Sequence, residues 1–302
     1  MNIKINFFKM LFIFRNDQNA FWSSIFFKLE LFIYTAIFLP FLYLNRLIPE
    51  KKRIYFAQFR TDRIGHLALG FYIRYAKINL KIYKKRCLYC FSEEISNQFF
   101  IKQIRKYFFV NRLVRLIIII CRNLPYLKCL IDNEPFSAVR DLEGLTQKSK
   151  MPDFTFQENL VCHKWLRSNG WEGPNQKIIC FHIRDDVFLK KFFENSKQKN
   201  VDWSYHKYRD SDIDDFIDSI KWFLKKNYFV IRTGIFAKKR VKINSKNFID
   251  YPFCLDKNPL IDIWIFSNCD LLISTGSGID EISSAYKIPK INVNYLPLSN
   301  SQ

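Results

Sequence analysis

The stretch that decides the fold is Asp270-Leu-Leu-Ile-Ser-Thr-Gly-Ser-Gly-Ile-Asp-Glu281. Its apolar start is typical of a buried strand, and the acidic residues at its end open a helical pattern. Between them lies a loop of small hydroxyl and glycine residues, which lets a backbone approach a ligand closely and supplies N–H and O–H donors. The stretch therefore predicts a strand, a tight loop and a helix start suited to a phosphate. The same pattern also serves as an ordinary strand-to-helix turn, because it matches neither the dinucleotide nor the P-loop fingerprint.

Apolar strand patterns and helical patterns alternate on both sides of this stretch. Strands are predicted at 54–59, 86–92, 177–182, 228–232, 248–251, 270–274 and 290–294, and helices at 67–76, 97–111, 112–131 (broken near Pro125), 155–170, 211–226, 260–268 and 279–287. Ser211 is the expected cap of the helix at 211–226, whose three early aspartates then match its dipole and are not metal ligands. This alternation predicts an α/β fold with parallel sheets and helices on both faces.

The chain divides into three segments in this interpretation. Residues 1–50 form an apolar helical segment, 51–150 an N-terminal Rossmann-like domain, and 151–302 a C-terminal Rossmann-like domain. The boundary between the two domains falls in the polar, turn-rich region at 132–153, which shows no clear period.

The first segment is very rich in phenylalanine, including the run Phe7 to Phe14. Its uninterrupted apolar part, Leu31 to Leu44, is shorter than the roughly 20 residues that span a bilayer, and Lys28 and Glu30 precede it. No small-residue cleavage site follows, so we do not expect a removable signal peptide. Three alternatives stay open: an anchor lying in the membrane interface, a marginal transmembrane helix, or a helix packed on the domain.

Composition narrows the range of partners. The 302 residues carry a net charge of +20 and are 49% hydrophobic, which excludes a disordered chain and favours anionic partners. No nucleic-acid-binding module is recognisable, so nucleic acid is not an expected partner. Among the eight cysteines, only Cys87 and Cys90 form a CxxC pair, and it lies in an apolar strand without a second pair at zinc spacing. We expect reduced, buried cysteines and no metal site.

Functional side chains follow three predicted strands where each one ends. Carboxyl ends of parallel strands share one sheet edge, and arginine forks pair bidentately with phosphate oxygens, so a diphosphate site is predicted there. The alternative is a surface ion-pair network of Arg184 and Arg232 with Asp185, Asp186 and Asp210. The predicted donor-binding residues are Arg184, Arg232, Thr233, Gly234, Ser274, Thr275, Gly276, Ser277, Gly278, Asp280 and Glu281, the last two as candidate contacts to the ribose or the sugar.

Two further loops complete the predicted pocket. The turn Arg60 to His66 follows the first strand and places His66 at the edge where ligands bind, as a general base or simply as a turn residue. His66 and Asp185 are the candidate catalytic residues. Arg63, His182, Tyr208, Arg209 and Asp210 are expected in the pocket as well, with Tyr208 and Arg209 either gating the site or docking a helix start.

Four motifs occur in order: Arg63-Ile-Gly-His-Leu67, His182-Ile-Arg-Asp185, Tyr208-Arg-Asp-Ser-Asp212 and Ser274-Thr-Gly-Ser-Gly-Ile-Asp280. Together they resemble a family of bacterial glycosyltransferases found with surface-polysaccharide genes, over most of the chain from about Arg53. More distantly, His182-x-Arg184 followed by the Ser-Thr-Gly-Ser loop is similar to motifs of fucosyltransferases that use GDP-fucose, in which the arginine binds the donor diphosphate.

The resemblance implies a GT-B fold, in which the C-terminal domain holds a nucleotide-sugar and the N-terminal domain the acceptor. It also implies metal-independent transfer, because arginines and a helix start neutralise the leaving diphosphate. Two features depart from the family patterns. Asp186 lies one position away from the acid of the fucosyltransferases, and a further helix crossing back to the first domain is expected beyond Asn294.

The sequence thus favours a glycosyltransferase that moves a sugar from a nucleotide-sugar to a cell-surface glycan or lipid-linked acceptor. It would need no cofactor and would work at the inner face of the membrane. One alternative is a non-catalytic, membrane-associated binding or scaffold protein. Another is a nucleotide-sugar 2-epimerase, which would need carboxylates facing the sugar from both domains, and the N-terminal half offers few.

Overall fold

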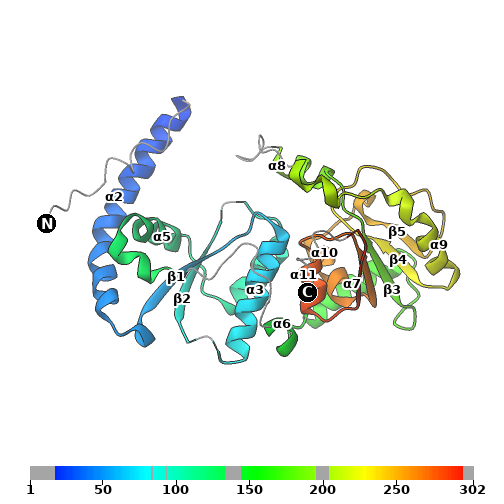
Figure 1. Ribbon diagram of the computed structural model, residues 1–302, viewed down its shortest axis with the longest axis horizontal. Coiled ribbons are helices and arrows are strands. Elements are labelled where there is room, and N and C mark those ends of the chain that lie inside the picture. Colours follow the sequence, from blue (N-terminus) through cyan, green and yellow to red (C-terminus); the bar gives the residue numbers. More distant parts are fainter. Residues whose placement is uncertain (1–17, 83, 93, 133–143, 195–203, 295–302) are drawn as a thin grey trace.

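Two parallel sheets organise the computed structural model, which describes residues 18–82, 84–92, 94–132, 144–194 and 204–294 (Figure 1). The first sheet pairs β1 (Ile54–Phe59) with β2 (Arg86–Phe91). The second has the order β5-β4-β3-β6-β7, formed by Phe248–Asp250, Phe229–Arg232, Ile178–His182, Leu271–Ser274 and Lys290–Asn292. Every pairing between these strands is parallel, so the predicted α/β fold is confirmed.

The helices of the first half cover both faces of its sheet. The α-helices are α2 (Gln18–Leu47), α3 (Ile64–Asn79), α4 (Gln98–Tyr107) and α5 (Leu113–Asn123), with short 3-10 turns η1 (Glu50–Lys52) and η2 (Pro125–Leu130). Phe56 packs with α5, η2 and the end of α2, while Ala57 and Phe59 pack on the other side with α3 and α4. The helix α3 begins earlier than predicted, which places His66 in its first turn instead of in the preceding loop.

The second half contains α7 (Phe156–Ser168), α8 (Val187–Phe193), α9 (Ile217–Lys225), α10 (Pro259–Asn268) and α11 (Asp280–Ala285), and α6 (Leu145–Lys148) precedes them. Its 3-10 turns are η3 (Ser204–Arg209), η4 (Ile213–Phe216) and η5 (Tyr251–Phe253). The predicted capping box of α7 is confirmed: Thr155 accepts from Glu158 N, and Glu158 accepts from Thr155 N. The predicted cap Ser211 is wrong, because Asp212 caps η4 by accepting from Asp214 N, and α9 follows that turn.

The strand order of the second sheet creates a crevice at its centre. From β3 the chain builds β4 and β5 on one side, and then returns to place β6 and β7 on the other. Such a reversal leaves the carboxyl ends of the two central strands without a connection crossing above them, and ligands of open α/β sheets bind there. Here those ends are His182 and Ser274, which lie opposite each other in the ladder. The loop of the stretch 270–281 therefore begins at this crevice.

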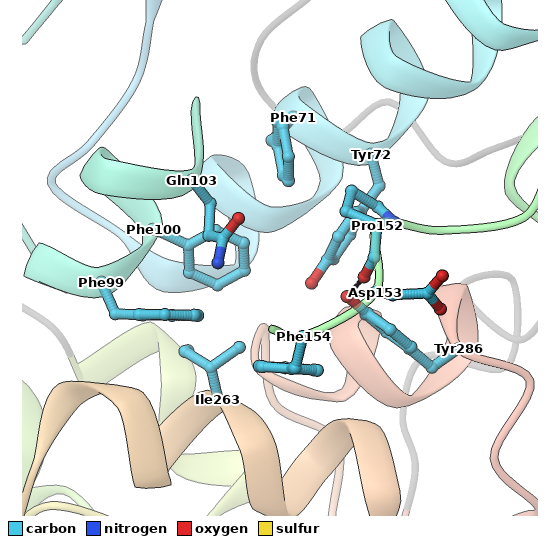
Figure 2. A pocket seen from close by; sticks show the side chains of 10 residues that line it. All are labelled: Phe71, Tyr72, Phe99, Phe100, Gln103, Pro152, Asp153, Phe154, Ile263 and Tyr286. Atoms are coloured by element: carbon cyan, nitrogen blue, oxygen red, sulfur yellow. Dashed lines mark hydrogen bonds between the residues drawn. The ribbon is translucent and has the colours of Figure 1, made fainter. Parts of the chain in front are cut away.

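An aromatic junction joins the two halves (Figure 2). Phe99 of α4 stacks on Phe154 with ring centroids 5.8 Å apart, and Tyr72 of α3 meets Tyr286 edge to face at 5.7 Å. The Tyr286 hydroxyl donates to Pro152 O over 2.7 Å, and Ile263 of α10 completes the contact. One apolar cluster thus runs through both halves, and the division into domains near residue 150 remains a prediction.

The long N-terminal helix α2 covers Gln18–Leu47, and the apolar helical segment at 1–50 stays a prediction. The run Phe7 to Phe14 lies outside the described residues, as does 133–143 of the predicted interdomain region. Within the described ranges, no helix is both long enough and apolar enough to cross a membrane.

Candidate functional site

A cavity of about 900 Å³ lies between the two halves, at the carboxyl edges of the strands. It is large enough for a ligand the size of a nucleotide-sugar, since ligand sites range over roughly 300–1,000 Å³. Twelve of the residues predicted from the sequence line it: Arg63, His66, His182, Arg184, Asp185, Arg209, Thr233, Gly234, Gly276, Ser277, Gly278 and Glu281. The others, Tyr208, Asp210, Arg232, Ser274, Thr275 and Asp280, do not contribute to its lining.

Two glycines bring the halves into backbone contact beside the cavity. A Cβ atom on Gly65, in the first turn of α3, would lie 2.5 Å from Gly278 Cα, and a Cβ on Gly278 would lie 2.9 Å from Gly65 Cα. Real Cβ atoms do not approach backbone this closely, so both positions require glycine in this arrangement. The loop that the sequence predicted to hold the donor thus touches the loop that it predicted to face the acceptor.

The 274–278 loop is organised around a carboxylate of its own. The Ser274 hydroxyl lies 2.8 and 2.9 Å from the two oxygens of Asp280, and Ser277 N donates to Asp280 over 2.9 Å. Gly276 N in turn donates to the Ser274 hydroxyl over 3.2 Å. Asp280 is buried, and its carboxylate accepts hydrogen bonds from N–H and O–H groups that were predicted to bind a phosphate. In this structure Ser274 and Asp280 therefore shape the loop and do not face the ligand space.

Thr275 ties the loop to the end of β3. Its hydroxyl accepts from Arg184 N over 2.9 Å, and its own backbone N–H donates to His182 O over 3.2 Å. Thr275 is fully buried, so it also has a supporting position instead of a ligand-facing one. The two bonds fix where the Arg184 side chain leaves the backbone.

Three arginines from different parts of the chain converge on the cavity: Arg63, Arg184 and Arg209. The pKa of Arg184 lies below its usual value, first because the side chain is buried and next because of the positive charges of Arg209 and, more weakly, Arg63. Asp210 forms an ion pair with Arg184 at 3.3 Å. The lining as a whole carries five basic side chains (Arg63, Arg184, Arg209, Lys287 and Lys290) against four carboxylates (Asp62, Asp185, Asp262 and Glu281). The positive charge is concentrated where the three arginines meet, and such a cluster suits a polyanionic ligand.

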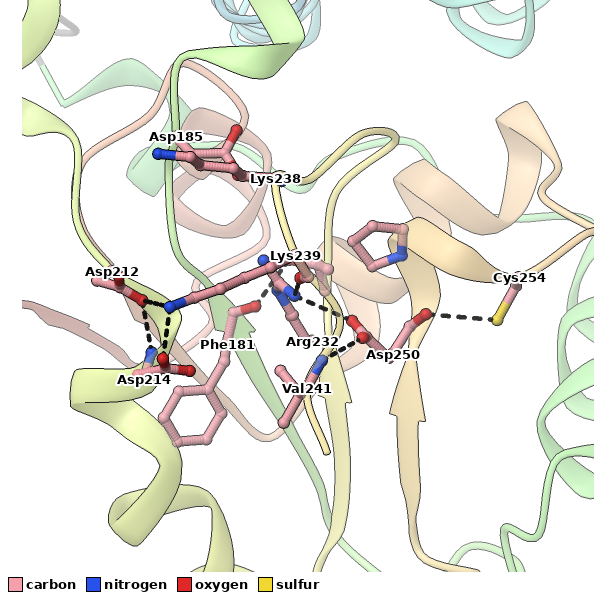
Figure 3. Close-up of polar contacts among 12 residues, drawn as sticks. Phe181, Asp185, Asp212, Asp214, Arg232, Lys238, Lys239, Val241, Asp250 and Cys254 are labelled. Atoms are coloured by element: carbon pink, nitrogen blue, oxygen red, sulfur yellow. Dashed lines mark hydrogen bonds and ion pairs between the residues drawn. The ribbon is translucent and has the colours of Figure 1, made fainter. Parts of the chain in front are cut away.

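Arg232 is placed differently from the prediction (Figure 3). Its guanidinium is 2% exposed, forms an ion pair with Asp250 at 3.3 Å and donates to Lys239 O over 2.6 Å. Asp250 also accepts from Val241 N over 2.8 Å. The buried pair anchors the segment that follows β4, and Arg232 does not reach the cavity.

Asp185 also has backbone partners. One of its carboxylate oxygens accepts from Val187 N over 3.0 Å and the other from Lys238 N over 2.8 Å. Although Asp185 lines the cavity, these two bonds hold the start of α8 against the segment after β4. A catalytic role for Asp185 remains a prediction, and it would require the carboxylate to act while holding both loops.

His182 is held by Thr233. Its Nδ1 lies 3.0 Å from the Thr233 hydroxyl oxygen, and that hydroxyl donates to Phe181 O over 3.2 Å. We assign the one hydroxyl proton of Thr233 to the carbonyl, so that His182 supplies the proton of the first bond. Nδ1 is therefore protonated, and Nε2 is left as an acceptor. Burial lowers the pKa of His182, which favours this neutral form.

His66 is the second histidine of the cavity. Burial, followed by the positive charges of Arg60 and Arg63, lowers its pKa to about 4, so the ring is neutral at physiological pH. The neutral imidazole is the form that a general base needs, but a pKa this low makes it a weaker base than an ordinary histidine. The predicted position of His66 at the ligand-binding edge thus agrees with its place in the cavity lining.

Other polar lining residues were not predicted. Asp62 forms an ion pair with Arg60 at 2.9 Å. It lies in the same turn as Arg63, and its position in a turn that was expected to be functional could have identified it. Asp262 lies at the start of α10 and accepts a hydrogen bond from the Tyr251 hydroxyl; burial raises its pKa to about 6. No sequence signal separates Asp262 from an ordinary acidic residue in a first helical turn.

Neither a metal cluster nor a disulfide is found in the described part of the chain. No group of three or more His, Cys, Asp or Glu side chains there has the arrangement to hold a metal ion, and the cysteines are free. Burial raises the pKa of Cys90, Cys121 and Cys162 to about 12, so these thiols stay protonated.

Comparisons with known proteins give one distant structural likeness. No protein-family model and no curated protein matches the sequence. Among solved structures, the ADP-heptose LPS heptosyltransferase II of E. coli aligns over 79% of this chain and 84% of its own, with 11% sequence identity and a TM-score of 0.39. A likeness this remote does not establish a shared activity, so the function has to follow from the residues of the cleft.

Proposed function

We propose that the protein is a glycosyltransferase of GT-B type, which transfers a sugar from a nucleotide-sugar to a cell-surface glycan or a lipid-linked acceptor. The observation that carries this proposal is the meeting of Arg63, Arg184 and Arg209 at a topological crevice, inside a cavity of about 900 Å³. A nucleotide-sugar has a diphosphate between two neutral groups, and this cavity combines a cationic zone with apolar walls.

The arginines supply the main chemical requirement of sugar transfer. As the bond to the anomeric carbon breaks, negative charge grows on the leaving diphosphate, and fixed guanidinium groups stabilise that charge. Arg184 is the central member of this group, because its backbone is fixed by Thr275 and its side chain by Asp210. We include metal-independent transfer in the proposal, and activity that survives EDTA would support it.

The acceptor would enter from the N-terminal half. His66 is our candidate for its activation, since the neutral ring lines the cavity and can accept a hydroxyl proton. Asp62 lies in the same turn and is the one carboxylate that this half contributes among the described lining residues. His182 Nε2 is available on the other half as a hydrogen-bond acceptor for a sugar or ribose hydroxyl.

One set of contacts favours the second candidate, a non-catalytic binding or scaffold protein. Asp185, one of the two catalytic candidates, has both carboxylate oxygens bonded to backbone N–H groups, and Asp280 is enclosed in its own loop. A protein that binds a nucleotide-sugar without transferring the sugar would need the arginines alone. The epimerase alternative has less support, because Asp62 is already paired with Arg60.

Binding and turnover test the proposal separately. A thermal-shift screen of UDP, GDP, CMP and dTDP sugars would identify the donor, and calorimetry would then compare the wild type with Arg184→Ala. We expect Arg184→Ala to abolish binding while the fold survives. The control is Arg240→Ala, which removes an exposed arginine of the same half outside the cavity lining. Unchanged nucleotide titration in Arg184→Ala would refute the site, and binding without transfer or hydrolysis of the sugar would favour the scaffold.

A further inference from the structure

The helix α2 carries an apolar stripe that faces away from the protein. The stripe consists of Leu29, Ile33, Ile37, Phe41 and Leu44, which are spaced by four, four, four and three residues and so lie along one side of the helix. Their exposed fractions are 54%, 48%, 60%, 45% and 64%. Five large apolar side chains in one exposed line form a patch of the kind that marks an interaction site. We call these residues the outer stripe.

The outer stripe is exposed although α2 itself is firmly held by the core. On the opposite side of α2, Phe38 and Leu42 pack into the apolar cluster of α5 and η2. Asn45 then clamps the helix to β1, donating to Ile54 O over 2.8 Å and accepting from Ile54 N over 2.9 Å. In Figure 1 the N-terminal part of α2 extends upward past α5. The orientation of the stripe is thus set by the core.

The segments that follow α2 or pack against it are strongly basic. Residues 41–53 contain four basic side chains and residues 111–131 another four, against one acidic residue, Glu50. These basic residues are Arg46, Lys51, Lys52, Arg53, Arg112, Arg115, Arg122 and Lys128. The Arg46 guanidinium also lies 5.5 Å from the ring of Tyr126, which is 58% exposed. Tyrosine of this kind is enriched where an apolar medium meets water.

We propose that α2 docks the protein on the surface of an anionic lipid bilayer. The outer stripe would enter the boundary between head groups and acyl chains, and the neighbouring basic residues would contact anionic head groups. A lipid surface offers both chemistries at once. A second copy of this chain does not, because it would bring an equally basic surface against the first. This docking is independent of the proposed transfer reaction.

Sedimentation of the full chain with vesicles tests the docking. One set of vesicles contains phosphatidylcholine alone and the other a mixture of phosphatidylcholine and phosphatidylglycerol. We expect binding to the anionic set, weakened by salt, and its loss in the variant Ile33→Gln/Ile37→Gln/Leu44→Gln. Glutamine keeps a good helix propensity, so the helix should persist. Lys51→Gln/Lys52→Gln should weaken binding by about fivefold per residue.

The matched control removes exposed apolar side chains elsewhere. Phe156 and Leu255 are 76% and 104% exposed on the second half, and Phe156→Gln/Leu255→Gln should bind vesicles like the wild type. Circular dichroism checks that each variant is folded. Three results would overturn the proposal: no binding to anionic vesicles, equal loss in the stripe and control variants, or a soluble dimer that the stripe variant dissociates without any vesicle binding by the wild type.

Discussion

Gly65 and Gly278 touch backbone to backbone beside the cavity, although they lie in different halves of the chain. A Cβ on Gly65 would come within 2.5 Å of Gly278 Cα and within 2.8 Å of Gly278 O. Neither glycine has a positive φ, so alanine is excluded there by the neighbouring backbone and not by its own conformation. The two halves can approach this closely here because neither residue has a side chain.

The first prediction concerns that contact. Gly278→Ala should force the two loops apart, costing about 1–3 kcal/mol of stability and weakening nucleotide binding by tenfold or more. Gly70→Ala is the matched control: it lies inside α3, its added Cβ would meet only Arg74 Nη1 at 3.7 Å, and alanine should stabilise the helix by up to about 1 kcal/mol. Chemical unfolding and nucleotide titration check both. Wild-type behaviour of Gly278→Ala would mean that the two loops do not touch in solution.

The second prediction separates two arginines that look alike in the sequence. Arg232→Met leaves Asp250 without its cationic partner and should lower the free energy of unfolding by about 3–5 kcal/mol. The fraction that folds should still bind nucleotide. Adding Asp250→Asn removes the stranded charge and should recover part of the loss. Arg184→Met should show the opposite pattern, with little change in unfolding and loss of binding. If Arg232→Met kept its stability and lost binding, the roles assigned to the two arginines would be reversed.

The third prediction concerns the proton of His182. Thr233→Val removes the hydroxyl that accepts from Nδ1, so the ring is free to place its proton on Nε2. Nitrogen-15 chemical shifts of labelled histidine should then show a change of tautomer, and sugar transfer should fall by roughly fivefold to tenfold, the value of one hydrogen bond. Thr233→Ser keeps the hydroxyl and should retain both properties. An unchanged tautomer in Thr233→Val would contradict this assignment, whatever the activity.

The fourth prediction is a pH dependence of stability. The pKa of His66 is about 4 in the folded protein and near 6.5 when unfolded, so the unfolded state binds more protons between these values. The contribution of His66 is therefore complete above pH 6.5 and is lost as the pH falls towards 4. Asp262 works in the opposite direction, because its folded pKa of about 6 lies above its ordinary value and its contribution is lost as the pH rises through 6.

Two variants separate these opposing terms. Unfolding of His66→Gln, followed from pH 4 to 8, should be less sensitive to acid than that of the wild type. Asp262→Asn should lose less stability than the wild type as the pH rises from 4 to 7. If His66→Gln and the wild type lost stability in parallel over the whole range, the lowered pKa of His66 would be wrong.

Most of the fold was predictable because short apolar runs in the sequence mark the strands. β1 was predicted at 54–59 and forms there, and the other strands agree to within one or two residues. The start of α3 was misplaced, because Ile64 and Gly65 read as part of a turn. The cap of η4 was missed by one residue, since Ser211 and Asp212 are both good capping residues and only the geometry selects Asp212.

The location of the candidate site was predictable from the sequence, but the roles of its individual residues were not. Sequence reasoning brought three strand ends to one edge, and the structure places His182, Arg184, Thr233 and Gly276 around one cavity there. It could not show that Arg232 is taken by Asp250, 18 residues later, because that pairing depends on how β4 and β5 align. Nor could it show that Asp280 folds back on Ser274, because an acid at a helix start has several equally good partners.

The aromatic junction of Figure 2 limits how ligands reach the cleft. Swinging the halves apart like a clamshell would pull Phe99 from Phe154 and Tyr72 from Tyr286, exposing apolar surface at about 25 cal/mol per Å². Tyr72 and Ile263 of the junction lie on α3 and α10, which also contribute residues to the cavity lining. This cost disfavours the junction as a hinge. Entry and exit then fall to the loops at the mouth. For the proposed sugar transfer, we expect product release to follow the rate of local movements in these loops.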